Sequence, residues 1–198
     1  MKSNHPGTAF RRRIYRSPLP FVRDLYCVMS SLRPVLALSS KSGIPAAFRE
    51  RIMMVVTGVN RCRHCAYGHE YLASLAGISK HEISGLLAQD LTNSPAGEIP
   101  ALLFSIHWAE TDGRPSAEAQ ADLAARYGVA VARQIEAAAL MIQIGNRIGN
   151  TFDFLLSRIS MGRFGLLASE RETHMLAGGK DDASWMRGTR LADRGHDR

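Results

Sequence analysis

Apolar residues recur at intervals of three and four along most of the chain, which is the spacing of one face of an α-helix. This period covers residues 21–38, 46–57, 60–76, 79–89, 99–110, 116–128 and 129–159. Alternating β-branched runs between turn residues, which are typical of strands, are missing from the sequence. The pattern therefore predicts an all-α fold of about six to seven helices.

Turn and cap residues predict where these helices begin and end. Pro34 should kink or end the first helix near Arg33, because proline lacks the backbone N–H and clashes with the preceding turn. Gly58 and Asn60 predict a break, with Asn60 as the N-cap of the helix that follows. The other predicted boundaries are the break at 42–45, the capping box of Ser79 and Glu82, the linker at 91–98, the cap at Ser116 and the stop at Gly128.

The composition is that of a globular protein with a substantial core, since 45% of the 198 residues are hydrophobic. No apolar run reaches the roughly 18 residues of a membrane span, and no secretion signal is recognisable, so we expect a cytoplasmic protein that binds no membrane. The tails at 1–13 and 174–198 flank one helical domain over residues 14–173.

The net charge of +7 at first suggests nucleic-acid binding, but its distribution argues against it. Four basic residues lie in 1–13, and residues 174–198 carry five basic and four acidic groups, so the body has no basic stripe. We expect these charges to be solvated, the tail from residue 174 to be disordered, and no nucleic-acid partner.

Three cysteines are present, which is too few and an odd number for a disulfide scaffold. Cys27 lies in an apolar-periodic helix, and we expect it in the core. Cys62 and Cys65 are separated by two residues and His69 follows. At about 100° per residue, these three side chains share one face within a wedge of about 60°.

This arrangement suits thiol chemistry, because the thiolate is the nucleophile and few free cysteines are ionised at neutral pH. A helix N-terminus favours negative charge on Cys62, and His69 can take the proton of Cys65 or stabilise its thiolate. The second cysteine can close a disulfide with an oxidised first one, which avoids irreversible oxidation.

A proton relay needs a further group, and Glu50 lies twelve residues before Cys62. With a break at 58–60, the preceding helix can fold back and present Glu50 to His69, orienting the imidazole. His64 adds positive character, although helical geometry points it away from the cysteine face by about 100–160°.

These residues resemble a known family. Arg49-Glu50, Asn60, Cys62-x-x-Cys65, His69 and residues 76–79 are similar to the core of the AhpD-like alkylhydroperoxidases of the carboxymuconolactone decarboxylase superfamily. The resemblance is specific over about residues 45–90. It is weaker over 129–158, where Asn146, Asn150 and Phe152 resemble the family's later Asn-containing helix.

The resemblance implies an AhpD-like helical bundle, often trimeric or hexameric, with the CxxC at the start of a helix. It implies a hydroperoxide-reducing enzyme without a cofactor, in which Cys65 attacks and Cys62 resolves the sulfenic acid. His69 would take the Cys65 proton, Glu50 would support His69, and His64 would assist. A lipoyl-type or other thiol protein would reduce the disulfide. The decarboxylase branch generally lacks the cysteine pair, which argues against decarboxylation.

Three alternatives stay open. The pair could serve general thiol–disulfide exchange, or act as a redox switch in a non-catalytic oligomeric binding protein. Cys62, Cys65, His69 and either Glu50 or His64 could also bind zinc. Structural zinc sites usually have a second Cys or His pair, which this sequence lacks, so we expect no metal.

Overall fold

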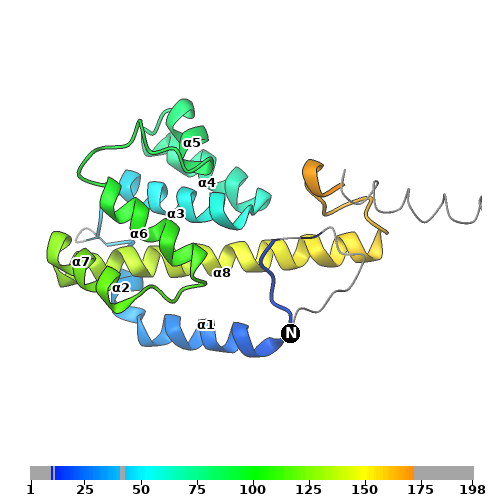
Figure 1. The fold of residues 1–198 in the computed structure, drawn as a ribbon, viewed down its shortest axis with the longest axis horizontal. Helices are drawn as coiled ribbons and strands as arrows, with labels where there is room; N and C mark the ends of the chain where they lie inside the picture. The colour runs from blue at the N-terminus through cyan, green and yellow to red at the C-terminus, as the bar shows by residue number, and fades with distance from the viewer. Residues whose placement is uncertain (1–9, 11, 41–42, 172–198) are drawn as a thin grey trace, which may run out of the picture. The chain divides into compact units, whose positions relative to one another are not determined.

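The computed structural model describes residues 10, 12–40 and 43–171 (Figure 1). In this part of the chain, helices joined by turns and loops are the regular secondary structure. The helices are α1 (Pro18–Ser30), α2 (Leu32–Ala37), α3 (Ala46–Asn60), α4 (Arg63–Leu75), α5 (Lys80–Leu87), α6 (Ile99–Glu110), α7 (Ala117–Tyr127) and α8 (Val129–Ile159). The predicted all-α class is confirmed, and the cysteine pair lies at the start of α4.

The chain divides into two compact units. One consists of residues 12–151 and contains α1 to α7 and most of α8. The other consists of residues 1–11 and 152–198, and within it the rings of Phe10 and Phe154 pack edge to face with centroids 5.5 Å apart. The single domain predicted over 14–173 stays a prediction, and the tail predicted to be disordered from residue 174 lies outside the described residues.

Several helix ends agree with the caps in the sequence. The Ser79 side chain accepts a hydrogen bond from the N–H of Glu82 at the start of α5, and Ser116 does the same for Ala119 in α7. Gly128 ends α7 with φ +77, a left-handed conformation that glycine adopts without strain. These boundaries depend only on neighbours a few residues away, which is why the sequence predicts them.

The first predicted break is misplaced. The chain breaks at Ser31, between α1 and α2, and not near Arg33. Pro34 is the third residue of α2, where the backbone N–H has no partner within the helix and its absence therefore costs nothing. The break adds a helix, so the fold exceeds the six or seven predicted.

Helix α3 is the centre of the hydrophobic core and packs against α4, α5 and α6. Ile52, Met54, Val55 and Val56 of α3 are fully buried. Helix α8 lies beside α3, and the Thr57 hydroxyl of α3 donates a hydrogen bond to Asn146 Oδ1 of α8 (3.2 Å). No helix among the described residues is long and apolar enough to span a membrane.

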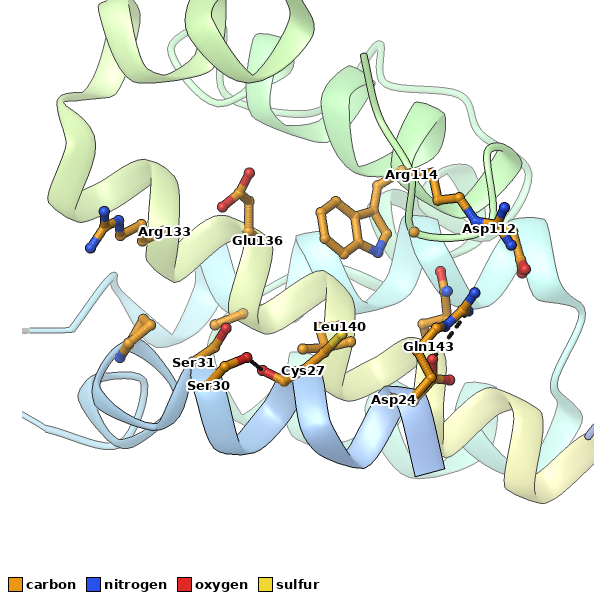
Figure 2. A pocket seen from close by; sticks show the side chains of 15 residues that line it. Asp24, Cys27, Ser30, Ser31, Asp112, Arg114, Arg133, Glu136, Leu140 and Gln143 are labelled. Atoms are coloured by element: carbon orange, nitrogen blue, oxygen red, sulfur yellow. Dashed lines mark hydrogen bonds and ion pairs between the residues drawn. The ribbon is translucent and has the colours of Figure 1, made fainter. Parts of the chain in front are cut away.

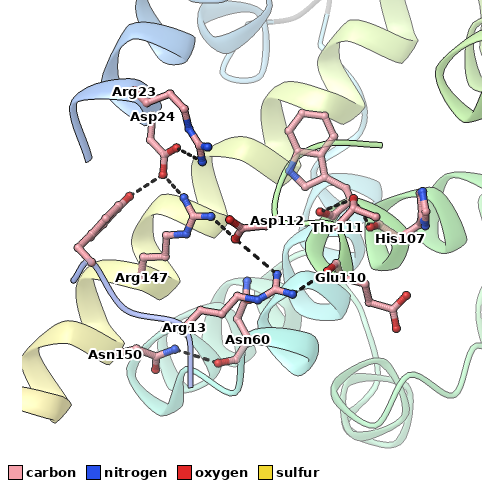
Figure 3. A network of polar contacts seen from close by, with 12 residues as sticks. Arg13, Arg23, Asp24, Asn60, His107, Glu110, Thr111, Asp112, Arg147 and Asn150 are labelled. Atoms are coloured by element: carbon pink, nitrogen blue, oxygen red, sulfur yellow. Dashed lines mark hydrogen bonds and ion pairs between the residues drawn. The ribbon is translucent and has the colours of Figure 1, made fainter. Parts of the chain in front are cut away.

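Two described arginines of the basic segment, Arg12 and Arg13, are not solvated as expected; Lys2 and Arg11 lie outside the described residues. Arg12 is 5% exposed and donates to Asn150 Oδ1 on α8. Arg13 donates to the backbone oxygen of Glu110 at 2.7 Å (Figure 3). These two arginines join the end of α6 and the middle of α8, so part of the N-terminal charge is structural.

Arg147 lies at the centre of a buried polar network on α8 (Figure 3). Its guanidinium forms ion pairs with Asp24 of α1 and with Asp112 after α6. The Tyr15 hydroxyl donates to Asp24 (2.9 Å), and burial together with that carboxylate raises the pKa of Tyr15. The network connects three segments that are far apart in sequence.

Candidate active site

The turn between α3 and α4 determines the position of the cysteine pair. Helix α3 continues through the break predicted at Gly58 and ends at Asn60, so Asn60 is not an N-cap. Gly58 has another role: a Cβ there would lie 2.4 Å from the backbone oxygen of Leu87, so glycine allows α3 to approach α5. Arg61 then adopts the left-handed conformation (φ +54), and the chain turns into α4.

Cys62 is the N-cap of α4. Its backbone is extended, and its sulfur accepts a hydrogen bond from the N–H of Cys65 (3.4 Å), the role that a Ser or Asn oxygen usually has. The Sγ atoms of Cys62 and Cys65 are 2.8 Å apart, and both thiols are free. The Cys62 side chain is 1% exposed, whereas Cys65 is half-buried.

The two thiols differ in acidity. Hydrogen bonding from the Cys65 thiol, helped by the Cys65 backbone N–H and by the positive charge of His64, lowers the pKa of Cys62 to about 7 against the opposing effect of burial. The pKa of Cys65 is raised, because its thiol donates to Cys62 and because of burial. At pH 7 about half of the molecules therefore carry one negative charge on the pair, and this charge resides mainly on Cys62.

His64 lies closer to the pair than helical geometry predicts. A Cβ placed on Gly149 would lie 2.8 Å from Cys62 Sγ and 3.7 Å from His64 Cδ2, so the side chains of Cys62 and His64 both face Gly149 of α8. The sequence-based angle assumes that Cys62 is inside the helix. Because Cys62 is instead the extended N-cap, its side chain does not follow the 100° rotation.

Glu50 and His69 form a direct contact. Glu50 is 2% exposed, and its Oε2 lies 2.7 Å from His69 Nδ1, while Arg49 Nε donates to Oε1 (3.3 Å). An ionised carboxylate only accepts hydrogen bonds, so Nδ1 carries the hydrogen and Nε2 is left to accept a proton. Neighbouring turns of α3 and α4 thus bring together two residues that are nineteen positions apart in sequence.

A glycine face on α8 completes the site, and the sequence analysis missed it. Gly149 lies against Cys62, and a Cβ on Gly145 would be 4.0 Å from Cys65 Sγ. Two glycines four residues apart in a long helix share one face, and this spacing is the signal that would have revealed them. Without side chains at these positions, the α8 backbone lies directly beside the sulfurs.

Buried amides surround this contact. Asn150 Nδ2 donates to the backbone oxygen of Asn60 (2.9 Å; Figure 3), and Asn146 is fully buried beside Gly145. The side-chain nitrogen of Asn146 and both polar atoms of the Asn60 amide have no hydrogen-bond partner within the described part of the chain. Asn146 and Asn150 thus attach α8 to the end of α3 next to the cysteine pair.

Two other sequence expectations concern metals and Cys27. Within the described part of the chain, no three His, Cys, Asp or Glu side chains are grouped in a way that could hold a metal ion. Cys27 is half-buried and lines a cavity, so the expectation of a core position is wrong. The cavity, which residues of α1 and α8 line together, leaves one side of Cys27 uncovered.

The fold and the site together define an all-helical dithiol protein in which a glutamate–histidine pair adjoins a helix-capping cysteine pair. Residues 32–111, less than half of the chain, match the model of the Carboxymuconolactone decarboxylase family. The family includes both AhpD-type alkylhydroperoxidases and decarboxylases. Neither a curated protein nor a solved structure matches the chain. The matched segment contains Glu50, Cys62, His64, Cys65 and His69.

Proposed function

We propose that the protein is a thiol-dependent peroxidase that reduces organic hydroperoxides with its cysteine pair. The observation that carries this proposal is the arrangement of the two thiols: their sulfurs lie 2.8 Å apart at the N-terminus of α4, and the pKa of Cys62 is lowered there. Glu50 of α3 and His69 of α4 form a hydrogen-bonded pair beside them in the proposed relay. A thiol pair ionised near neutral pH supplies the nucleophile, and an oriented imidazole supplies a proton acceptor and donor.

Cys65 attacks the peroxide, because it is the sulfur that a substrate can reach, whereas Cys62 is sealed from solvent. The resting charge lies on Cys62, so the Cys65 proton must first move to Cys62 across the 2.8 Å contact or to His69. The Cys65 thiolate then forms a bond to the distal peroxide oxygen as the O–O bond breaks. The departing alkoxide takes the proton that Cys62 or His69 received from Cys65 and leaves as the alcohol, and Cys65 becomes a sulfenic acid.

Cys62 resolves this intermediate. Its thiolate attacks the Cys65 sulfur, the S–O bond breaks, and hydroxide leaves as water with a proton that His69 has taken up from solvent. Glu50 stabilises the histidine cation in this step, since its carboxylate is ion-paired with Nδ1. His64 supports the negative charge on Cys62. Two electrons from a lipoyl-type or other thiol protein return the disulfide to the dithiol.

The exposed faces of two helices suit the partners that this cycle needs. The outer face of α4 presents Tyr67, Tyr71 and Leu75, which are 82%, 66% and 68% exposed, beside the site. Such a surface is suited to docking a reductant protein. On α1, Leu19 and Tyr26 are more than 70% exposed, and we assign this helix to contact between subunits of a homo-oligomer.

Rapid mixing of the reduced protein with cumene hydroperoxide tests the proposal. Both thiols of the pair should disappear as the alcohol forms, and repeated turnover should follow with a dithiol reductant. Cys65→Ser should abolish the reaction, whereas Cys27→Ser should leave it intact. Full turnover by Cys65→Ser would show that the proposal is wrong.

General thiol–disulfide exchange is a second candidate, favoured by the lowered pKa of Cys62, because acidic thiols in Cys-x-x-Cys pairs exchange readily. Comparison of the rates with cumene hydroperoxide and with a small disulfide separates the two functions. A protein that forms its disulfide reversibly but turns over neither substrate would instead be a redox switch.

A further inference from the structure

The cavity that Cys27 lines lies between α1 and α8 (Figure 2). It has a volume of about 620 Å³, within the range of small-molecule sites. Arg133, Glu136, Leu140 and Gln143 of α8 line it at positions i, i+3, i+7 and i+10, which is one face of the helix. Gly145 and Gly149 contact the sulfurs from the opposite face, so the cavity is separate from the proposed peroxidase site.

Part of the cavity wall is apolar. Trp108 at the end of α6, Ala137 and Leu140 of α8, and Cys27 of α1 contribute to its wall. Such a lining favours a ligand with a hydrocarbon body, because burying apolar surface contributes roughly 25 cal/mol per Å².

Two polar atoms in this wall have no partner. Gln143 is 2% exposed, and among the residues that the structure describes its Oε1 accepts no hydrogen bond and the Trp108 Nε1–H donates none. Both side chains converge on Gly113, where a Cβ would lie 3.1 Å from Gln143 Nε2 and 3.6 Å from Trp108 Nε1. A buried donor without an acceptor costs about 1–3 kcal/mol, so an unpaired indole N–H in a cavity wall indicates a missing acceptor.

One arginine among the charged residues around the cavity has no ion pair with a described residue. Asp24 and Asp112 are neutralised by Arg147, and Glu136 accepts from Gln120 and lies in the field of Arg133. Arg114 lines the cavity and has no ion pair with any residue that the structure describes. Its guanidinium matches the planar, bidentate geometry of a carboxylate.

We infer that this cavity binds a small organic carboxylate whose apolar body lies over Trp108 and Leu140 and whose charged end meets Arg114. The carboxylate supplies the anion that Arg114 lacks and an acceptor near the indole. The hydrocarbon body lies against the apolar part of the wall. Binding at this cavity is independent of the cysteine pair, so its ligand takes no part in the proposed peroxidase reaction.

The test uses octanoate as the probe and octylamine as its charge-reversed control. Trp108 and Trp185 are the two tryptophans, so Trp185→Phe makes Trp108 the sole fluorescent reporter. Octanoate should change Trp108 fluorescence saturably, and octylamine should not. In a Cys62→Ser/Cys65→Ser variant, octanoate should also slow alkylation of Cys27, which lines the same cavity.

Arg114→Gln should weaken octanoate binding about tenfold or more, as expected for one charge-assisted contact. Arg126→Gln is the matched control: Arg126 is an arginine on α7 that pairs with Asp122 outside the cavity, so binding should be unchanged. Cys65→Ser should bind octanoate normally, which separates this inference from the peroxidase proposal. Absent saturation, an equal response to octylamine, or unchanged binding by Arg114→Gln would each overturn it.

Discussion

Replacing Gly149 by alanine examines the contact between α8 and the cysteine pair. The added Cβ would lie 2.8 Å from Cys62 Sγ, closer than such atoms approach in folded proteins. Alanine in a helix interior is otherwise favoured over glycine by about 1 kcal/mol, whereas overpacking a tight interior typically costs about 1–3 kcal/mol. The difference between these two effects predicts that the free energy of unfolding of Gly149→Ala is between unchanged and about 2 kcal/mol lower.

Gly145→Ala is the matched comparison. Its Cβ would lie 4.0 Å from Cys65 Sγ, an ordinary van der Waals contact, so the helix-propensity gain is not opposed. This variant should therefore be more stable by up to about 1 kcal/mol. The two substitutions are chemically identical and one turn apart, so the predicted difference of about 1–3 kcal/mol isolates the contact with Cys62.

Urea unfolding of the reduced variants measures this difference, and the pH dependence of thiol alkylation shows what happens at the site. Displacement of Cys62 by the alanine methyl should lengthen the sulfur–sulfur contact that lowers the pKa of Cys62, and the alkylation midpoint should rise. If Gly149→Ala is as stabilising as Gly145→Ala and leaves the midpoint unchanged, the close approach of α8 to the sulfurs is not present in solution.

Three further predictions concern ionisation, the relay and assembly. Because the pKa of Cys62 is lowered to about 7, the alkylation rate of the pair should be low in acid and increase with pH, with a midpoint near pH 7 in a stopped-flow pH series. His64→Ala should move that midpoint to higher pH, because the positive charge of His64 helps to lower the pKa of Cys62. Glu50→Gln removes the charge that stabilises protonated His69, and the rate of oxidation by hydroperoxide should drop by roughly 10²-fold, whereas an unchanged rate would exclude the relay. Tyr26→Glu places a charge on the exposed face of α1, and light scattering should show a smaller mass than that of the unaltered protein; equal masses would mean that α1 is not the subunit contact.

The helices and much of the site follow from short-range features of the sequence. Ser79 and Ser116 predict helix starts correctly because a cap depends on a donor three residues away. The spacing of Glu50, Cys62, Cys65 and His69 similarly predicts thiol chemistry, because few arrangements other than a thiol relay combine these residue types. The catalytic roles of these residues stay predictions until the variants are measured.

The places where the sequence misled are governed by contacts between distant segments. Gly58 looks like a helix break, yet it lies within α3 because the Leu87 backbone approaches it. Arg12 looks like part of a solvated tail, but Asn150 provides a buried partner for it 138 positions away. Neither partner can be recognised from neighbouring residues.

Local sequence predicted the all-α class and a pairing of Glu50 with His69, which lies one helical turn after Cys65, because helix periodicity, caps and residue chemistry act over a few positions. The burial that distinguishes Cys62 from Cys65 and the glycine face of α8 arise only when helices distant in sequence pack together, whereas the lowered pKa of Cys62 comes from Cys65 and His64 within three positions of it. The physical reason is that a side chain is buried, and a helix backbone comes close to it, only in the assembled core. There the absence of a Cβ at Gly149 determines whether the α8 backbone can lie against Cys62.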